Sequence, residues 1–394
     1  MIIPAVFTST ETQHLNVKIH QPLTIVSTAD LHIGRFDLAY QYSVLKQQMI
    51  EPLYNIDFDI FVIAGDFFNS KVMANSQTVM YGCLFFNDIV NLCKYKNATL
   101  IIIEGTKDHD NGQLKLFYSY LSDPDLDLRI VEQARFEIVK GIRILCLPEE
   151  YNKPQSYYDN LLLYSGLYDI AIVHGMYKGA VYQDKVINTE NFDPRNKIFT
   201  MDDFCNCRGY ILAGHVHTSG CFDRYFYYCG SPYRWCFGEE EPKGFFISFY
   251  NPDTCEHYCY FQEIICHQYI TLNIDDMIDK NPDEIIYYIN LLLKDIEYIR
   301  IELPDEPNEV QLANIEMIKI YYRNNNRVKI KMTNSKKKKV IEQTKEQNKE
   351  LEPFLFLLDH NLDKYEKLSM YINIKEGYDC TNSSEVKEIL EDLT

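Results

Sequence analysis

The sequence lacks the features that mark membrane, secreted and disulfide-stabilised proteins. No apolar run reaches about 18 residues, so no transmembrane helix and no membrane contact are expected. The first residues have neither a basic start nor a long apolar core, and we therefore expect no signal peptide. Without an export signal, the 12 cysteines are expected to be reduced thiols of an intracellular, cytoplasmic protein.

Basic residues are also scarce, with 39 Lys and Arg against 57 Asp and Glu and a formal net charge of −18. This balance argues against a protein that coats nucleic acid through bulk positive charge. It does not exclude a nucleic-acid enzyme, because local patches and bound cations set the local field. Residues 323–350 carry ten basic and three acidic residues, which indicates either a nucleic-acid contact or a solvated linker.

Short apolar runs that end in polar clusters recur through the first two thirds of the chain. They lie at residues 23–32, 59–66, 99–110, 142–150, 169–175 and 209–217. Runs of this length are typical of buried strands. The longer mixed segments 38–54 and 78–95 can hold helices, and the alternation predicts a layered α/β domain over residues 1–262.

A second, smaller unit is expected over residues 263–332. Predicted strands at 267–274, 298–303 and 327–332 alternate with predicted helices at 285–294 and 310–322. Asn281, Pro282 and Glu284 form a helix start before the first of these helices. This order suits a small α+β domain, followed by a basic linker at 333–350 and amphipathic helices within 351–394.

Aspartates and histidines gather where the predicted strands end. They are Asp30, His32, Asp66, Asp108, His109, His174, His215 and His217. In open α/β sheets the functional crevice lies at the carboxyl ends of the strands, so these side chains are expected to converge. They exceed the needs of one tetrahedral zinc ion and suit two adjacent ions that share a carboxylate. Nitrogen and oxygen ligands without thiolate favour Mn²⁺ or Fe²⁺, with Zn²⁺ as an alternative.

The order of these motifs resembles the signature of the calcineurin-like metallophosphoesterases. The matching segments are Asp30-Leu31-His32, Gly65-Asp66, Gly105 to Asp110, His174-Gly175 and Gly214-His215-Val216-His217. Residues 230–246 resemble the corresponding segment of SbcD-type subunits of DNA double-strand-break repair nucleases. The resemblance implies a four-layer α/β sandwich, a capping domain that binds DNA, and a C-terminal helical segment that binds an SbcC-type coiled-coil ATPase.

The resemblance also implies a role for each site residue. One ion would be held by Asp30, His32, Asp66 and His217, and the other by Asp66, Asp108, His174 and His215. His109 would be the acid that assists the leaving 3′-oxygen. Ser231 and Arg234 are candidates for substrate binding, with a purely structural role as the alternative.

The third motif departs from the family pattern, which is usually Gly-Asn-His followed by Asp or Glu. This chain has Gly105-Thr106-Lys107-Asp108-His109-Asp110. Aligning His109 with the family histidine places Asp108 at the asparagine position and adds two residues to the turn. A shifted alignment that makes Asp110 the ligand, or neither aspartate, is the alternative.

The expected function is that of a metal-dependent nuclease in DNA repair and recombination, with 3′–5′ exonuclease activity on duplex ends and endonuclease activity on single strands. The expected cofactors are two divalent ions, most readily Mn²⁺, and the expected assembly is a homodimer within a heterotetramer with the ATPase. Two alternatives stay open. One is a phosphoesterase of the same superfamily that acts on small molecules or proteins, and the other is a catalytically weak DNA-tethering scaffold.

Overall fold

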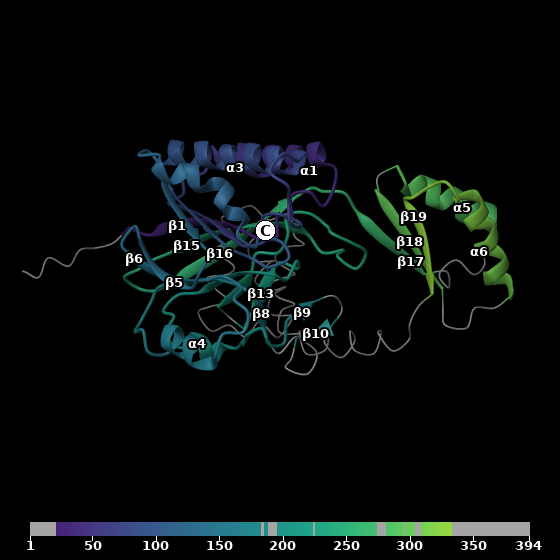
Figure 1. The fold of residues 1–394 in the computed structure, drawn as a ribbon. Helices are drawn as coiled ribbons and strands as arrows, with labels where there is room; N and C mark the ends of the chain where they lie inside the picture. The colour runs from purple at the N-terminus through teal and green to yellow at the C-terminus, as the bar shows by residue number, and fades with distance from the viewer. Residues whose placement is uncertain are drawn as a thin grey trace, which may run out of the picture.

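The structure, a computed structural model, describes residues 21–182, 185–187, 195–223, 225–273, 281–294, 296–303 and 309–332. It has the mixed α/β architecture that the sequence predicts, with two six-stranded sheets in one body and a three-stranded sheet in a smaller module (Figure 1). No helix in these ranges is long and apolar enough to cross a membrane. The predicted linker 333–350 and the predicted helical segment 351–394 lie outside the described residues.

The first sheet of the body has the strand order β16-β15-β1-β2-β3-β4. Four of its strands are parallel: β1 (Leu23–Thr28), β2 (Ile60–Ala64), β3 (Thr99–Ile103) and β4 (Asp127–Val131). The antiparallel strands β15 (Lys243–Tyr250) and β16 (His257–Ile264) extend it beside β1. Every residue of β2 and β3 is buried, which explains why all of them except Thr99 are apolar.

The second sheet has the order β13-β14-β12-β7-β6-β5. Its central strands β6 (Ile142–Leu147), β7 (Ile170–His174), β12 (Ile211–Gly214) and β14 (Phe226–Tyr228) are parallel. The edge strands β5 (Arg135–Val139) and β13 (Gly220–Phe222) are antiparallel to their neighbours. Short strands form two further pairs: β8 (Met176–Tyr177) with β11 (Ile198–Phe199), and β9 (Val181–Tyr182) with β10 (Lys185–Val186).

The two sheets enclose one apolar core, to which Val62 and Ile101 contribute from the first sheet and Ile172 and Leu212 from the second. Helices cover the outer faces (Figure 1). On the first sheet lie α1 (Leu38–Leu45), the π-helical turn η1 (Lys46–Ile50), α2 (Glu51–Leu53), α3 (Gln77–Lys96) and the 3₁₀ segment η2 (Gln113–Ser122). On the second lie α4 (Gln155–Leu162) and the 3₁₀ turn η3 (Met201–Phe204).

The longest helix, α3, shows how local sequence sets these elements. Ser76 precedes it, and its side chain accepts a hydrogen bond from the Val79 amide at 3.3 Å. Asn97 ends it in a left-handed conformation, with φ of 52°. Between these residues, apolar side chains spaced three and four residues apart pack on the first sheet.

The smaller module contains β17 (Tyr269–Asn273), α5 (Pro282–Leu292), β18 (Tyr298–Leu303), α6 (Glu309–Tyr321) and β19 (Val328–Met332). The elements occur in the order that the sequence predicts. All three strands are parallel, so α5 and α6 are crossover helices of βαβ units, and they lie together on one face of the sheet (Figure 1). The module has its own apolar core, which is dominated by isoleucine.

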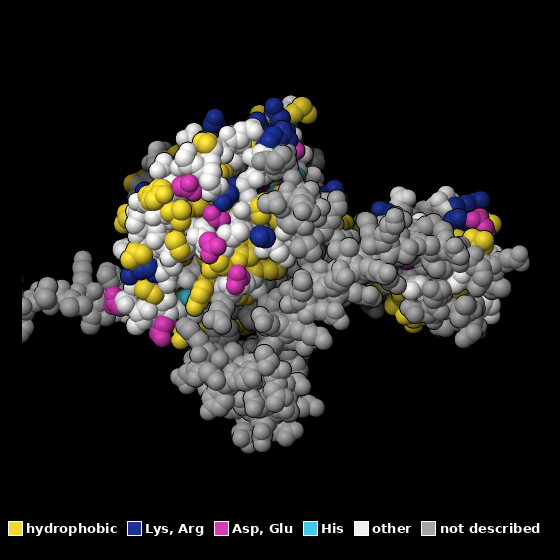
Figure 2. Space-filling model, turned by 90° about the horizontal axis from the view of Figure 1, so that it is seen from below, with side chains coloured by type: hydrophobic (Ala, Val, Ile, Leu, Met, Phe, Trp, Pro, Cys, Tyr) yellow, Lys and Arg dark blue, Asp and Glu magenta, His cyan; other side chains and the backbone are white. Residues whose placement is uncertain are grey.

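The surface agrees with the acidic composition. On the face that Figure 2 shows, Lys and Arg side chains of the described residues are scattered among acidic and hydrophobic ones and form no continuous basic stripe. On that face, attraction of a polyanion therefore depends on local groups rather than on a broad positive field.

Candidate metal centre

The carboxyl ends of strands from both sheets deliver polar side chains to one buried cluster. Asp30 and His32 follow β1, Asp66 follows β2, His174 ends β7, and His215 and His217 follow β12. All six side chains are buried, with exposed fractions between 0 and 8%. Burying this many ionisable groups is costly unless they are paired or bind metal. The structure thus brings together six of the eight residues that the strand-end pattern singled out.

Close approach of the two sheets at this point depends on a glycine. Gly65, between β2 and Asp66, has a φ of +89°, and a Cβ atom there would overlap the imidazole of His174. Only glycine fits both the left-handed backbone and the lack of space. The Gly-Asp pair therefore lets a strand of the first sheet touch a histidine of the second.

Several of the clustered residues also have a left-handed backbone without being glycine. The φ angles are 52° at Asp30, 43° at His32, 54° at Asp66 and 96° at His215. Such conformations are uncommon for residues that carry a Cβ atom, and they gather at functional sites. The loops after β1, β2 and β12 hold these side chains at an energetic cost that packing elsewhere must offset.

The ligand atoms form two neighbouring groups. In the first, Nε2 of His32 lies 3.1 Å from Nε2 of His217, and Asp30 offers a carboxylate oxygen. In the second, Nε2 of His174 and Nδ1 of His215 face a carboxylate, that of Glu149. Within each group the ligand atoms all lie within 4.8 Å of one another. Buried His, Asp and Glu side chains therefore form groups that can hold metal ions.

Asp66 lies between the two groups. Its Oδ2 atom is 3.8 Å from Nε2 of His32 and 3.3 Å from Nε2 of His174. A single carboxylate that reaches imidazoles of both groups has the placement of a shared ligand. The loop after β3 orients it, because the amide of Thr106 donates to Asp66 Oδ1 at 2.6 Å.

Hydrogen bonds at the far side of the rings set the orientation of three imidazoles. His174 Nδ1 donates to the carbonyl oxygen of Ala64 at 2.7 Å, and His109 Nδ1 donates to that of Asn69. His217 Nδ1 pairs with the Glu239 carboxylate at 3.1 Å. Since a carbonyl oxygen only accepts, the proton of the first two rings is on Nδ1 and Nε2 faces the cluster. This arrangement of supporting acceptors is typical of metal-binding histidines.

Burial and the neighbouring carboxylates shift the pKa values of the clustered histidines in opposite directions. Burial lowers the pKa of His32 well below its ordinary range, and the neighbouring imidazoles lower it further against the pull of Asp66. Burial would also lower the pKa of His174, but Asp66, Asp30 and Glu149 raise it to about 10. The carboxylates thus attract positive charge to the second group, where protons and a divalent ion would compete for the same atoms.

His109 lies at the edge of the cluster, where it forms a further potential metal-binding group with His32 and Asp66. Its Nε2 atom is 4.0 Å from Asp66 Oδ2, its ring centroid is 4.6 Å from that of His32, and its side chain is 21% exposed. It is thus within reach of both solvent and the shared carboxylate.

The structure does not bring Asp108 to the cluster, which overturns the alignment that made it a ligand. Asp108 is exposed on the turn after β3, and the metal-binding groups of the described residues do not include it. Asp110 is fully buried, but its carboxylate accepts from the amides of Phe67, Phe68 and Gly105. It therefore fastens the turn to the loop after β2.

Ser231 and Arg234, the candidates for substrate binding, have protein partners in the structure. Ser231 is fully buried, and its hydroxyl donates to the Tyr233 carbonyl oxygen at 2.5 Å. The Arg234 guanidinium contacts Cys266 Sγ and the Glu240 carbonyl oxygen. Both side chains stabilise the loop that follows His217, which is the structural alternative stated for them.

Residues that the sequence reading missed complete the surroundings. Trp235, the only tryptophan of the chain, stacks on His32 with ring centroids 4.7 Å apart, and the Arg35 guanidinium lies 4.6 Å from its ring. Glu239 links His217 to the buried Lys243, whose Nζ atom is 2.8 Å away. Glu149 and Thr106 enter the second group directly. For Glu149 a signal existed, because it follows the apolar run of β6 as the other candidates follow theirs.

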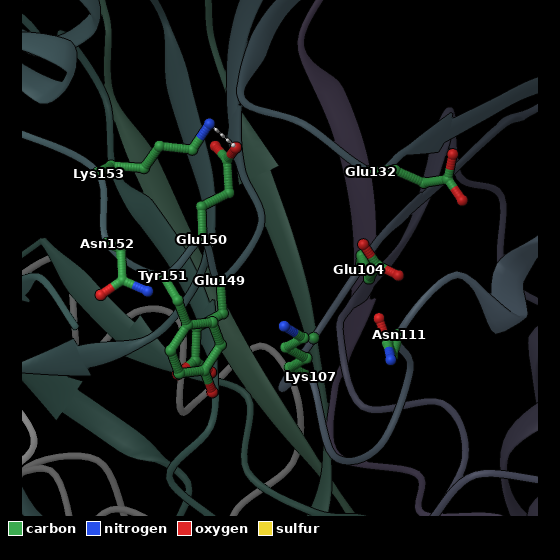
Figure 3. Close-up of a pocket in the computed structure, with 10 residues that line it drawn as sticks. Glu104, Lys107, Asn111, Glu132, Glu149, Glu150, Tyr151, Asn152 and Lys153 are labelled. Carbon is green, nitrogen blue, oxygen red and sulfur yellow. Dashed lines mark ion pairs between the residues drawn. The ribbon is translucent and has the colours of Figure 1, made fainter. Parts of the chain in front are cut away.

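A pocket of about 240 Å³ adjoins the second group (Figure 3). Its wall includes Glu149 and Gly105 of the cluster region, with Lys107 and Lys153 among its other side chains. Further carboxylates line it: Glu104, Glu132 and Glu150. Because acidic side chains predominate in its wall, the pocket is a poor site for an anion.

No family model matches this chain, and no curated protein is similar to it in sequence. Several solved structures match; one of them covers 62% of this chain and 100% of its own length, at 12% identity and a TM-score of 0.38. A likeness of that size carries no argument about fold or function.

Proposed function

We propose that this protein is a two-metal phosphodiesterase with the four-layer metallophosphoesterase fold, and that its substrate is DNA. The observation that carries the proposal is the buried cluster in which Asp66 lies between two groups of imidazoles and carboxylates. The donor set fits divalent ions such as Mn²⁺, because it combines imidazole nitrogen with carboxylate oxygen and contains no thiolate.

In this proposal Asp30, His32 and His217 would hold one ion, His174 and His215 would hold the other, and Asp66 would contribute to both. Bound together, the two ions supply positive charge for the phosphoryl oxygens and a water molecule of lowered pKa. The chain's own contribution is orientation: Ala64, Asn69 and Glu239 direct the rings, and Thr106 directs the shared carboxylate. His109, whose side chain is 21% exposed, would donate the Nε2 proton of its imidazolium form to the leaving oxygen, while its Nδ1 proton stays hydrogen-bonded to the Asn69 carbonyl oxygen.

The DNA substrate is supported by the resemblance of residues 230–246 to SbcD-type nucleases and by one local feature. Trp235 and the exposed Arg35 form a cationic aromatic surface directly beside His32. Bases stack on aromatic rings and on guanidinium planes, while a free inorganic phosphate gains nothing from them. This surface favours a nucleic-acid substrate over a small phosphate ester.

The test is a comparison of three substrates with Mn²⁺: a labelled linear duplex, a single-stranded circle and a chromogenic phosphodiester. We expect cleavage of both DNA substrates by the natural chain and none by Asp66→Ala. Cleavage of the chromogenic ester alone would instead establish the small-molecule alternative. Metal binding without cleavage of any substrate would establish the scaffold alternative.

The proposed partner is an SbcC-type coiled-coil ATPase, in a heterotetramer that contains two copies of this chain. The segment expected to bind it, residues 351–394, is outside the described residues. A chain truncated after Glu350 is expected to keep metal-dependent cleavage of single strands and to lose ATP-stimulated digestion of duplex ends. Precipitation of the truncated chain on its own would show that the segment belongs to this protein's own core.

A further inference from the structure

The second group of ligands contains a carboxylate where the metallophosphoesterase motif has a neutral amide. We infer that Glu149, from the second sheet, is the oxygen ligand that completes this position and replaces the asparagine missing from the third motif. The inference deepens the proposed function and rests on its two-ion centre. It assigns a metal ligand from a strand end that carries none of the resembling motifs.

The contacts of Glu149 place one of its oxygens in the cluster. Oε2 lies 3.2 Å from Nδ1 of His215 and 3.8 Å from Nε2 of His174. The side chain is only 6% exposed, and it forms a potential metal-binding group with these two histidines. A carboxylate buried at this distance from two imidazoles has the position of a third ligand to the same ion.

The other carboxylate oxygen of Glu149, Oε1, is fixed by a hydrogen bond from a residue outside the cluster. Asn196 donates to Oε1 at 3.0 Å, and the Tyr151 hydroxyl is also hydrogen-bonded to this carboxylate. Figure 3 shows Tyr151 beside Glu149 at the wall of the acidic pocket. Ligating carboxylates are commonly oriented by such outer contacts, which reduce the entropy lost when an ion binds.

Thr106 explains why a substitute ligand is needed. Thr106 directly follows Gly105 and therefore occupies the position at which the motif has asparagine. With His109 aligned to the motif histidine, Lys107 and Asp108 are then the two added residues. The Thr106 hydroxyl lies 3.3 Å from His174 Nε2 and donates to Glu149 Oε2 at 3.1 Å. A threonine side chain is shorter than asparagine and neutral, whereas Glu149 reaches the same space from β6 with a full negative charge.

The neighbouring Glu150 supplies a matched control. Its carboxylate faces the opposite way, toward Lys153 Nζ at 3.0 Å and the Tyr157 hydroxyl at 2.6 Å (Figure 3). It lines the same pocket and carries the same charge. A change at Glu150 therefore alters the local charge as a change at Glu149 does, but it removes no atom from the cluster.

Three measurements of Mn²⁺ binding test the inference: metal content per chain, a binding isotherm, and quenching of the fluorescence of Trp235. Trp235 stacks on His32 and is the only tryptophan, so its emission reports on the first group. We expect Glu149→Ala to retain one ion with unchanged quenching and to weaken the second by at least about 100-fold, since loss of an outer-shell partner alone costs about 10–100-fold.

Glu149→Gln tests the same point without creating a cavity. It restores an amide oxygen, so two ions should bind, with the second weakened by roughly tenfold, a smaller loss than removal of the ligand produces. Glu150→Gln and Glu150→Ala should bind two ions as the natural chain does. Two ions of undiminished affinity in both Glu149 variants would overturn the inference. A natural chain that binds no pair of ions would instead overturn the proposed two-ion centre, so the two failures are distinguishable.

Discussion

The two-sheet body and the small three-stranded module are built on the same plan, since each has parallel strands connected by helices. They differ in what they bury. The body encloses Asp30, Asp66, Asp110 and four clustered histidines. Among the described residues of the module, the buried polar side chains are the neutral Gln311 and Asn314, and the core is almost entirely isoleucine.

The difference in buried side chains shows that parallel strands alone do not create a functional site. In the body, strands of two sheets end against one another, so side chains from separate sequence regions converge at Asp66. The residues there also adopt left-handed backbone conformations, which none of the module's described residues does. Buried charge and strained loops identify the region that can hold metal ions, and apolar packing identifies the region organised for stability.

Asp66→Ala is the strongest test of the distinction between the two-sheet body, with its candidate metal centre, and the apolar module. The change removes the carboxylate that both groups share, so both ions should be lost and cleavage should fall to background. Metal analysis after gel filtration and a single-strand cleavage assay measure the two effects. If the variant still holds two tightly bound ions, the centre is assigned to the wrong residues.

His109→Ala should leave metal binding intact while it lowers the rate of cleavage. His109 lies near His32 and Asp66, with Nε2 4.0 Å from Asp66 Oδ2, but it belongs to neither of the two proposed ion-binding groups, so the metal content should be that of the natural chain. Loss of the proton donor should lower the rate of cleavage by about 10²–10⁴-fold. The control is a substrate with a better leaving group, for which the loss should shrink. A parallel fall in metal content would make His109 a ligand.

The sequence predicted most of the site because strand ends are visible as apolar runs followed by polar residues. Asp30, Asp66 and His174 were found in this way, and the structure brings them together. Asp108 was misplaced, since an insertion inside a turn cannot be positioned by spacing alone. Glu149 was missed because two adjacent glutamates follow β6, and the direction in which each points depends on Asn196 and Lys153.

Ile299→Ala is expected to weaken the module without touching the centre. Ile299 is fully buried in β18, and truncation of a buried isoleucine typically costs about 2–5 kcal/mol. Hydrogen exchange should accelerate in β17 to β19 while the Mn²⁺ content stays unchanged. The matched variant is Ile172→Ala, two residues before His174 in the core between the sheets. Loss of metal in the Ile299 variant would show that the two regions are coupled.

The smallest expected effect concerns the start of α5. Asn281 accepts from the Glu284 amide at 3.0 Å, and the Glu284 carboxylate accepts from the Asn281 amide at the same distance. Asn281→Ala leaves that Glu284 amide without its side-chain acceptor and should cost about 1 kcal/mol. Asn281→Ser, which keeps an oxygen in place, should restore nearly all of it. Hydrogen exchange of the first turn of α5 measures the difference. Because this helix start is exposed and belongs to the module, Mn²⁺ binding and cleavage should be the same in both variants as in the natural chain. A change in either would mean that the module positions the centre, and the division between the two regions would have to be abandoned.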